Sequence, residues 1–333
     1  MQDTSVMSSV DFEREGVQHG FLKLPHSTDG SAWGCIMIPI TVIKNGQGPT
    51  ALLTGGNHGD EYEGITSLLK LSNRLKSEQV QGRVIIVPMM NYPAVQNGTR
   101  TSPIDKGNLN RAFPGNPCGT ITEQIADYFQ RYLIPLCDYA LDIHSGGKTL
   151  DFIPFAAAHR LQNKAQEAQC IAAAKCFGAP NTLVMIDMQA HALYDTAVES
   201  AGKVFVSNEL GGGGTSNVES IAICDRGIDN FLIFSGIVKR ELNAPASPTR
   251  VLEMPDMGSY IQSVHRGIVE YCVALDGLVN EGDLIARIFS LERTGVEPEL
   301  YFAKGNGIVT ARHFPGIINI GDTLAVLSIE VDA

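Results

Sequence analysis

The sequence of 333 residues predicts an α/β fold with a mixed, largely parallel sheet flanked by helices, followed by a small β-rich module. Two observations predict this fold. Apolar runs of strand length alternate with amphipathic runs of helical length as far as about residue 240, and from Arg250 onward short β-like runs and frequent glycines replace the helical period. Alternating strands and helices are typical of layered proteins in which helices cover the faces of a sheet.

The individual elements follow from the same patterns. Strands are predicted at Cys35–Ile43, Thr50–Thr54, Arg83–Pro88, Tyr139–Ile143 and Lys203–Ser207, and helices at Glu63–Lys76, Thr122–Leu136, Arg160–Phe177 and Val218–Phe234. Capping boxes, Thr120-x-x-Glu123 and Ser216-x-x-Glu219, are expected to start the second and fourth helices. In such sheets ligands bind beyond the carboxyl ends of the strands, where His58, His144 and Glu209 stand.

A change of composition divides the predicted molecule into two domains. We expect an α/β catalytic domain over residues 1–245 and a β-rich module over residues 250–333, separated near Ala244-Pro245-Ala246-Ser247-Pro248. The module contains an internal repeat, because Gly267-Ile268-Val269 with Gly282-Asp283-Leu284 is echoed by Gly307-Ile308-Val309 with Gly321-Asp322-Thr323.

The repeat predicts a small β-sandwich or half-barrel, similar to biotinyl- and lipoyl-carrying modules. Neither Gly-Asp turn carries the lysine that those carriers modify, so a structural or interface role is favoured over a carrier role. Exposed strand edges in such a module leave self-association into a homo-oligomer open.

Composition excludes several classes of partner. The formal net charge is −11 and the pI is about 5.2, which disfavours nucleic acid and anionic membranes as partners. No stretch approaches the roughly 20 apolar residues of a membrane span, and residues 1–20 lack the basic and apolar regions of a signal peptide. The 7 cysteines form no Cys-x-x-Cys pair, which favours reduced, mostly buried thiols in a cytoplasmic protein.

His58 and Glu61 are the first candidate metal ligands. They stand three residues apart between an apolar run and an amphipathic helix, so both side chains can turn toward one point. A catalytic zinc ion typically has three protein ligands and one position open for water. The third candidate is His144, at the end of another apolar run. Asp142 lies two residues earlier on the same face of that strand, where it can hold the free nitrogen of the imidazole.

A structural role is the alternative for each of these residues. His-x-x-Glu occurs by chance, and a histidine that ends a strand is more often structural than metal-binding. We assign the structural role to the six other histidines, which stand in no comparable context: His19, His26, His159, His191, His265 and His313. Two imidazoles and a carboxylate suit Zn²⁺, although Co²⁺ and Mn²⁺ can occupy the same ligand set.

Glu209 is the candidate proton acceptor that hydrolysis needs beside the attacking water. It follows the predicted strand Lys203–Ser207 and precedes four glycines, which we expect to leave room for a substrate. A solvated loop carboxylate fits the local sequence equally well.

Asn110 and Arg111 form a candidate anion clamp. Together an amide and a guanidinium can grip a carboxylate through charge-assisted hydrogen bonds, and Arg100 can reach the same pocket. The alternative for each arginine is a surface ion pair of little energetic weight.

Taken together, these residues resemble the succinylglutamate desuccinylase/aspartoacylase family, a branch of the zinc carboxypeptidase superfamily. The match covers about residues 55–214 in the family's order: His-x-x-Glu, an arginine, Asn-Arg, a remote histidine, and glutamate before glycine. The resemblance implies a zinc-carboxypeptidase-like sheet and the C-terminal β module. It further implies one zinc ion on His58, Glu61 and His144, Glu209 as general base, Arg100 on the scissile carbonyl, and a substrate carboxylate on Asn110 and Arg111.

Within the family, the chain is most similar to the branch that deacetylates N-alpha-acetyl-L-2,4-diaminobutyrate in ectoine degradation. Its length, the Glu-Leu-Gly-Gly-Gly-Gly run and the C-terminal module carry this similarity. Aspartoacylases have a further arginine shortly before the catalytic glutamate, suited to a second substrate carboxylate. This sequence has no arginine between Arg160 and Arg226 and offers Asp195 and Glu199 instead, which favours a substrate with a free amine over a diacid.

The resemblance therefore implies a zinc-dependent amidohydrolase that removes an acyl group, acetyl in this interpretation, from a small N-acylated amino acid. Three alternatives stay open. The first is a hydrolase like aspartoacylase or succinylglutamate desuccinylase, and the second is a metallocarboxypeptidase for small peptides. The third is a non-catalytic zinc- or ligand-binding module, which the presence of both a base and a clamp disfavours.

Overall fold

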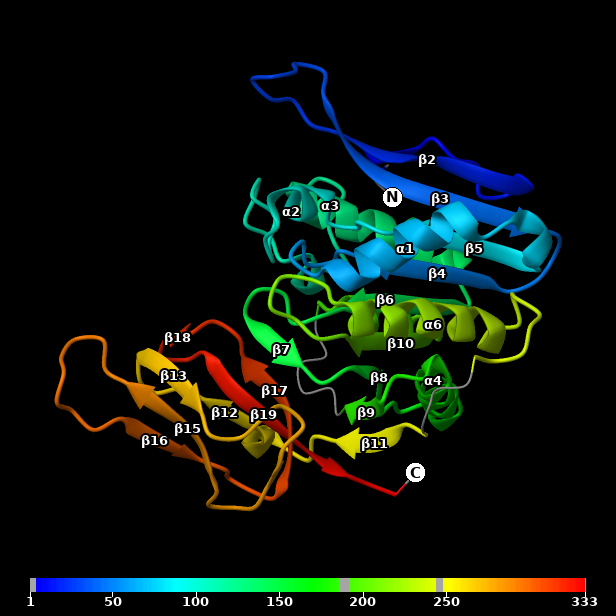
Figure 1. Ribbon diagram of the computed structural model, residues 1–333. Helices are drawn as coiled ribbons and strands as arrows, with labels where there is room; N and C mark the ends of the chain where they lie inside the picture. Colours follow the sequence, from blue (N-terminus) through cyan, green and yellow to red (C-terminus); the bar gives the residue numbers. More distant parts are fainter. Residues whose placement is uncertain (1–3, 186–191, 244–247, 333) are drawn as a thin grey trace.

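The structure, a computed structural model, describes residues 4–185, 192–243 and 248–332 (Figure 1). Its helices are α1 (Tyr62–Arg74), α2 (Tyr92–Asn97), α3 (Ile121–Tyr128), α4 (Lys164–Phe177), α5 (Tyr194–Ser200) and α6 (Val218–Phe234). The strands up to α6 are β1 (Met7–Ser8), β2 (Gly16–Pro25), β3 (Cys35–Asn45), β4 (Thr50–Gly55), β5 (Gly82–Val87), β6 (Tyr139–His144), β7 (Leu150–Phe152), β8 (Phe155–His159), β9 (Asn181–Met185) and β10 (Val204–Glu209). The later strands are β11 (Arg250–Glu253), β12 (Tyr260–Gln262), β13 (Gly267–Tyr271), β14 (Leu278–Val279), β15 (Leu284–Phe289), β16 (Glu299–Phe302), β17 (Gly307–His313), β18 (Ile317–Ile318) and β19 (Thr323–Glu330).

A mixed sheet runs through most of the described chain. Its order is β1-β2-β3-β5-β4-β6-β10-β8-β9-β11-β19-β17-β14, with β12 added beside β19 and β7 beside β17. The centre is parallel, because β6 pairs in parallel with both β4 and β10. The predicted α/β fold class with a second, smaller β structure is confirmed.

Helices cover both faces of this sheet (Figure 1). On one face, Leu68 of α1, Ala173 of α4 and Phe231 of α6 are buried in one apolar cluster with the central strands. On the other face, Ile125 of α3 and Val198 of α5 belong to a second buried cluster. The central parallel strands are therefore held between two apolar layers, which fixes the positions of their carboxyl ends.

The helix at α4 starts later than the sequence predicts. It begins at Lys164 rather than Arg160, because the side chain of Asn163 accepts hydrogen bonds from the backbone N–H groups of Ala165 and Gln166. An asparagine that satisfies these otherwise unpaired donors defines the first turn.

The capping box predicted for α6 is wrong by one residue, although the helix bounds are as expected. Instead of Ser216 and Glu219, the pair is Asn217, whose side chain accepts from the Ser220 N–H, while the Ser220 hydroxyl accepts from the Asn217 N–H. The box at Thr120 is confirmed, and α3 continues through a π turn and a 3₁₀ turn as far as residue 136.

The C-terminal part is a β-sandwich. A separate sheet, β16-β15-β13-β18, packs against strands of the main sheet through a cluster that includes Ile288 and Leu324. The internal repeat is confirmed, because both of its turns have one bonding pattern: the Asn280 N–H donates to Asp283, and the N–H of Asn319 donates to Asp322.

The main sheet crosses the predicted boundary between the two domains. β11 pairs in parallel with β9 on one side and antiparallel with β19 on the other. Most of the predicted linker, residues 244–247, lies outside the described residues. The division into domains at 1–245 and 250–333 stays a prediction.

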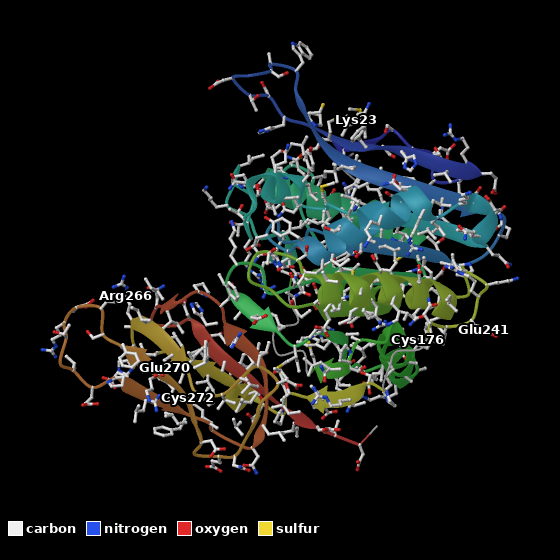
Figure 2. The ribbon with its side chains drawn as sticks, viewed as in Figure 1. Lys23, Cys176, Glu241, Arg266, Glu270 and Cys272 are labelled. Atoms are coloured by element: carbon white, nitrogen blue, oxygen red, sulfur yellow. The ribbon has the colours of Figure 1, made fainter. Side chains whose placement is uncertain are left out.

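All 7 cysteines are free thiols, but the expectation that most are buried is wrong. Cys35, Cys118 and Cys272 are exposed and Cys176 is partly so. Cys118 and Cys272 lie in loops, Cys35 is the first residue of β3, and Cys176 is near the end of α4. Figure 2 shows Cys176 and Cys272 in separate parts of the molecule. Among the described residues, no helix combines the length and apolar character needed to cross a membrane.

Candidate active site

Three neighbouring strands bring the candidate site residues to one edge of the sheet. His144 ends β6, and its register partner on β10 is Glu209. The turn between β4 and α1 carries His58 and Glu61. Gly59 in this turn packs so tightly that a Cβ there would lie 2.0 Å from the carbonyl carbon of Ala94. Only glycine allows this close approach, which helps to fix the direction of the two flanking side chains.

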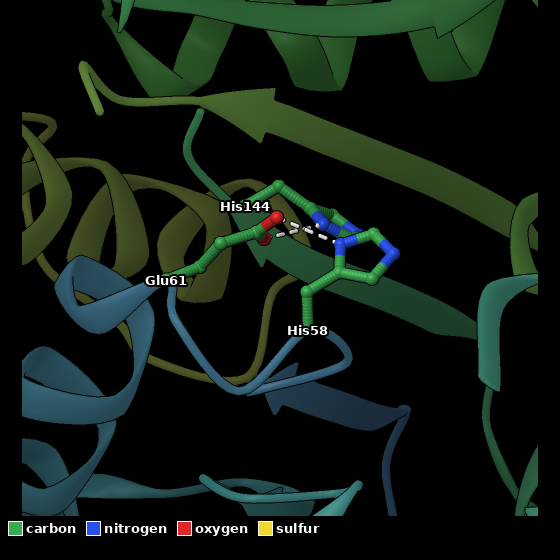
Figure 3. Close-up of side chains that lie close together, drawn as sticks. All are labelled: His58, Glu61 and His144. Atoms are coloured by element: carbon green, nitrogen blue, oxygen red, sulfur yellow. Dashed lines mark hydrogen bonds and ion pairs between the residues drawn. The ribbon is translucent and has the colours of Figure 1, made fainter. Parts of the chain in front are cut away.

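His58, Glu61 and His144 form a buried cluster that could hold a metal ion (Figure 3). Nδ1 of His58 lies 2.7 Å from Oε1 of Glu61, and Nδ1 of His144 lies 2.8 Å from Oε2 of the same carboxylate. The three potential ligand atoms lie within 4.8 Å of one another. This is a His₂Glu donor set of the kind that catalytic zinc sites use.

Asp142 orients one of the two imidazoles. Its Oδ2 lies 2.7 Å from Nε2 of His144 and accepts a hydrogen bond from the Asn57 amide, while its Oδ1 accepts from the Thr54 hydroxyl at 2.7 Å. The carboxylate is thus fixed from three directions. It leaves Nδ1 of His144 facing Glu61, which is the supporting arrangement that metal-binding histidines usually have.

The charged groups of the cluster shift one another's pKa values. Burial opposes ionisation of Glu61, but the charges of His58 and His144 outweigh it and hold the pKa of that carboxyl well below its usual range. Burial also disfavours a charged His144, yet the carboxylates of Asp142 and Glu61 raise its pKa well above the ordinary value. Burial and then the negative charge of Glu61 raise the pKa of Glu209 to about 8. A divalent cation beside Glu61 would offset the negative charge of that carboxylate and so lower the pKa of Glu209.

Two buried atoms without hydrogen-bond partners support the fit of a cation to these residues. Nε2 of His58 and Oε2 of Glu209 are buried and have no hydrogen-bond partner among the described residues. Buried polar atoms without partners are rare in proteins and often mark a site for an ion or water. Together with the donor set, these atoms indicate that the residues present fit a zinc ion.

Two of the glycines after Glu209 lie in close contact with neighbouring parts of the chain. A Cβ on Gly212 would lie 2.0 Å from the carbonyl oxygen of Leu150, and one on Gly213 would meet the ring of Phe314. Gly212 and Gly213 therefore make room for neighbouring parts of the chain. That the four glycines leave room for a substrate stays a prediction.

A cavity of about 490 Å³ opens beside the cluster. Its lining includes His58, Arg100, Arg111, His144 and Glu209. Nη1 of Arg100 lies 3.5 Å from Oε1 of Glu61, and 47% of the arginine side chain is exposed. A half-exposed cation thus lies beside a buried carboxylate at the cavity, where it can meet charge on a ligand.

Asn110 and Arg111 also line the cavity, from a 3₁₀ turn at Leu109–Arg111. The Asn110 side-chain oxygen is already used, because it accepts from the backbone N–H of Tyr194 at 3.0 Å. Nη1 of Arg111 donates to the Asn110 carbonyl oxygen at 2.6 Å, so the Asn110 amide nitrogen and the other N–H groups of the guanidinium remain as donors toward a ligand. Six of the seven predicted site residues therefore line one cavity, and the seventh, Glu61, contacts the two histidines among them.

Part of the wall was not predicted. The C-terminal strands contribute Tyr260, Gln262 and Thr323, and β8 contributes His159, to which the sequence assigns a structural role. No local pattern marks these residues, because they reach the cavity only through the sheet pairing of β8, β9, β11 and β19. His191 lies outside the described residues.

Residues 47–235 match the model of the succinylglutamate desuccinylase/aspartoacylase catalytic domain. The N-alpha-acetyl-L-2,4-diaminobutyric acid deacetylase of Halomonas elongata is 58% identical over 328 residues, which are 98% of this chain and 96% of that protein.

Solved structures are similar over nearly the whole chain. The product-bound ectoine utilization protein EutE (DoeB) of Ruegeria pomeroyi is 54% identical with a TM-score of 0.96, covering 98% of this chain and 100% of that one. A succinylglutamate desuccinylase of a Silicibacter species is 52% identical with a TM-score of 0.96, covering 99% of this chain and 100% of that one.

Proposed function

Because this chain belongs to the succinylglutamate desuccinylase/aspartoacylase family, we propose that it removes the acetyl group from N-alpha-acetyl-L-2,4-diaminobutyrate in ectoine degradation. That the chain is a hydrolase of amide bonds follows from the family and from the deacetylase that is 58% identical to it. The observation that carries the proposal is the buried cluster of His58, Glu61 and His144, with Glu209 beside it at one cavity. A cytoplasmic location stays part of the proposal.

We assign one Zn²⁺ to His58, Glu61 and His144. When bound, such an ion supplies Lewis acidity, which makes water a better nucleophile at neutral pH and polarises a carbonyl. The described donor set and the unpaired Nε2 of His58 support this assignment.

Glu209 moves the proton in the proposed reaction. It accepts a proton from the attacking water as the water oxygen bonds to the acyl carbon, and it delivers that proton to the leaving nitrogen as the C–N bond breaks. The products are acetate and the free diamino acid. One carboxylate can serve both steps because its half-buried position opposite His144 on paired strands keeps it at the same point throughout.

The arginines bind charge on the substrate. Arg100, which lies beside Glu61, is proposed to stabilise the oxyanion that forms on the acyl oxygen. Arg111 and the amide of Asn110 are proposed to bind the substrate carboxylate, which sets the scissile bond at a fixed distance from Glu209.

The test is a set of parallel assays on purified protein. N-alpha-acetyl-L-2,4-diaminobutyrate, N-acetyl-L-aspartate and N-succinyl-L-glutamate are compared at equal concentration, with zinc, with a chelator, and after zinc is restored. We expect the first substrate to have the highest kcat/KM and the chelator to abolish turnover reversibly. A higher kcat/KM for either diacid would contradict the proposed substrate. Turnover that does not depend on zinc would contradict the proposed role of the metal.

A further inference from the structure

We propose that Asp195 recognises the positively charged amine of the substrate and that His159 and Glu199 hold it in position. The carboxylate of Asp195 and the clamp of Asn110 and Arg111 line one cavity. The site can therefore bind a positively charged group and a carboxylate of the same small molecule. This inference rests on the proposed function and names the group that would select the substrate.

Asp195 lies in the first turn of α5, and 17% of its side-chain surface is exposed. Its Oδ1 accepts hydrogen bonds from the backbone N–H and the hydroxyl of Thr196. Its Oδ2 lies 3.9 Å from Nε2 of His159 and accepts no hydrogen bond from a described residue. One oxygen of a mostly buried carboxylate is therefore left for a donor that enters the cavity.

His159 and Glu199 form the support behind Asp195. Nδ1 of His159 lies 3.0 Å from Oε1 and 3.2 Å from Oε2 of Glu199, and only 6% of each of these two side chains is exposed. Two carboxyl groups flank one imidazole, so acidic groups outnumber the single basic group at this point. A buried excess of acidic groups of this kind favours a cationic ligand.

The backbone ties this acidic group to the anion clamp. The N–H of Tyr194, the residue before Asp195, donates to the side chain of Asn110. Burial and then the charge of Arg100 lower the pKa of Arg111, whereas the charge of Asp195 raises it, which also places the acid within electrostatic reach of the clamp. An amino acid with a free carboxylate and a cationic side chain matches this pair of opposite charges.

Asp195 has an alternative role as a helix-stabilising acid, since a carboxylate in the first turn of a helix interacts favourably with its dipole. That role would affect all substrates equally. Recognition of an amine would affect only substrates that carry one, so a comparison of two substrates separates the roles.

The experiment compares wild-type protein with Asp195→Asn on two isosteric substrates. N-alpha-acetyl-L-2,4-diaminobutyrate carries the ammonium, and N-acetyl-L-norvaline has a methyl group in its place. We expect Asp195→Asn to lower kcat/KM for the amine substrate by about 10- to 100-fold, the effect of one charged hydrogen bond. For acetyl-norvaline we expect kcat/KM to change by less than about twofold. The ratio of kcat/KM between the two substrates should therefore fall sharply in the variant.

Two control variants and a binding measurement complete the design. Glu241→Gln removes an exposed acid that is not part of the cavity lining (Glu241 is labelled in Figure 2), and it should change kcat/KM for neither substrate. His159→Gln should raise KM for the amine substrate more than it lowers kcat, because it disturbs the position of Asp195 and not the reacting atoms. Calorimetry should show L-2,4-diaminobutyrate, but not L-norvaline, binding more weakly to Asp195→Asn than to wild type.

An equal loss on both substrates, or an unchanged preference, would overturn the assignment of Asp195. If wild-type protein hydrolyses neither substrate, the proposed function fails. The binding of diaminobutyrate and norvaline then still decides the role of Asp195, because it needs no turnover.

Discussion

Glu209 and His144 stand opposite each other on one rung of the β6–β10 ladder. The distance from the proposed proton acceptor to a proposed metal ligand is therefore set by backbone hydrogen bonds of a buried parallel pair. The chemistry depends on individual side chains at this rung, so single substitutions should separate metal binding, proton transfer and substrate binding.

Replacing Glu209 by glutamine should lower kcat by about 100- to 10,000-fold, because the amide keeps the shape of the side chain but cannot accept the proton. Zinc content should stay that of wild type, since Glu209 is not one of the three clustered ligands. Steady-state kinetics and metal analysis measure both. The matched control is Glu219→Gln on the exposed side of α6, and near-normal turnover of Glu209→Gln would refute its role.

Replacing Arg111 by alanine should raise KM for the acetylated amino acid by about 10- to 100-fold with a smaller effect on kcat, because a charged hydrogen bond to the carboxylate is lost. Arg240→Ala, at an exposed position outside the cavity, is the matched control. The amide of the same substrate, which lacks the carboxylate charge, should be nearly insensitive to Arg111→Ala. Equal sensitivity of acid and amide would argue against the clamp.

At this scale, the sequence predicted the residues that stand in short motifs and missed those that do not. His58 with Glu61, and Asn110 with Arg111, are neighbours in the chain, so spacing alone identifies each pair. His159 reaches the cavity because β8 pairs with β10 and β9, and those pairings join segments far apart in sequence. The expected strand ends linked His58, His144 and Glu209, and the resemblance to a family linked all the motifs into one site.

The start of α3 shows how one side chain secures an element. The carboxylate of Asp105 accepts from the Thr122 N–H at 2.7 Å, from the Thr122 hydroxyl at 2.8 Å and from the Gly107 N–H at 2.9 Å. It thereby joins the loop that leads to Asn110 to the first turn of a helix. Burial opposes ionisation, but these hydrogen bonds outweigh it and hold the pKa of Asp105 below its ordinary value.

Replacing Asp105 by alanine should lower the free energy of unfolding by about 1–3 kcal/mol at pH 7, because buried donors lose their acceptor. A lowered native pKa stabilises the fold above the unfolded-state pKa of about 3.9, and this stabilisation is lost as the pH falls through the native pKa. The difference between wild type and variant in urea unfolding should therefore shrink below about pH 4. Glu78→Gln, an exposed acid, is the control, and a pH-independent difference would contradict this account.

Elements with a strong periodic pattern were predicted closely, and weakly patterned ones were not. α6 has the predicted bounds Val218–Phe234, and β4 begins at Thr50 as expected. β8 was missed because its sequence, FAAAH, is rich in alanine, which favours helices over strands, and its burial comes from its neighbours in the sheet. β2 was missed because glycines and a histidine interrupt its alternation.

The whole molecule is joined by one sheet that runs from the N-terminal strands through β11 to β19. An apolar cluster spans this junction and includes Phe155, Leu183, Leu252 and Val326. The C-terminal strands are thus packed into the same structure that supports the cavity. The separate sheet ends in the edge strands β16 and β18. Association into a homo-oligomer through such edges stays a prediction.

Zinc should stabilise the whole fold, because the native state holds three ligands close together and the unfolded chain does not. At 100 times its dissociation constant, a ligand adds about 2.7 kcal/mol to the free energy of unfolding. We expect the Tm to rise by several degrees with zinc and to fall again with a chelator, as measured by calorimetry.

The zinc-dependent gain should shrink as the pH is lowered, since protons compete for His58, Glu61 and His144. His58→Gln is the control variant and should show little dependence of Tm on zinc. A wild-type Tm that ignores both zinc and chelator would contradict the metal assignment.

The rung that joins His144 to Glu209 has a consequence for how this enzyme can diverge. The proposed reacting residues lie on or directly beside central strands, whereas Arg111 lies on a 3₁₀ turn and Asp195 on a short helix outside the sheet. After gene duplication, a few substitutions in those two segments could change the amino acid that is accepted without disturbing the hydrolytic centre. Selection for a new substrate can then act on cavity-lining side chains outside the central strands.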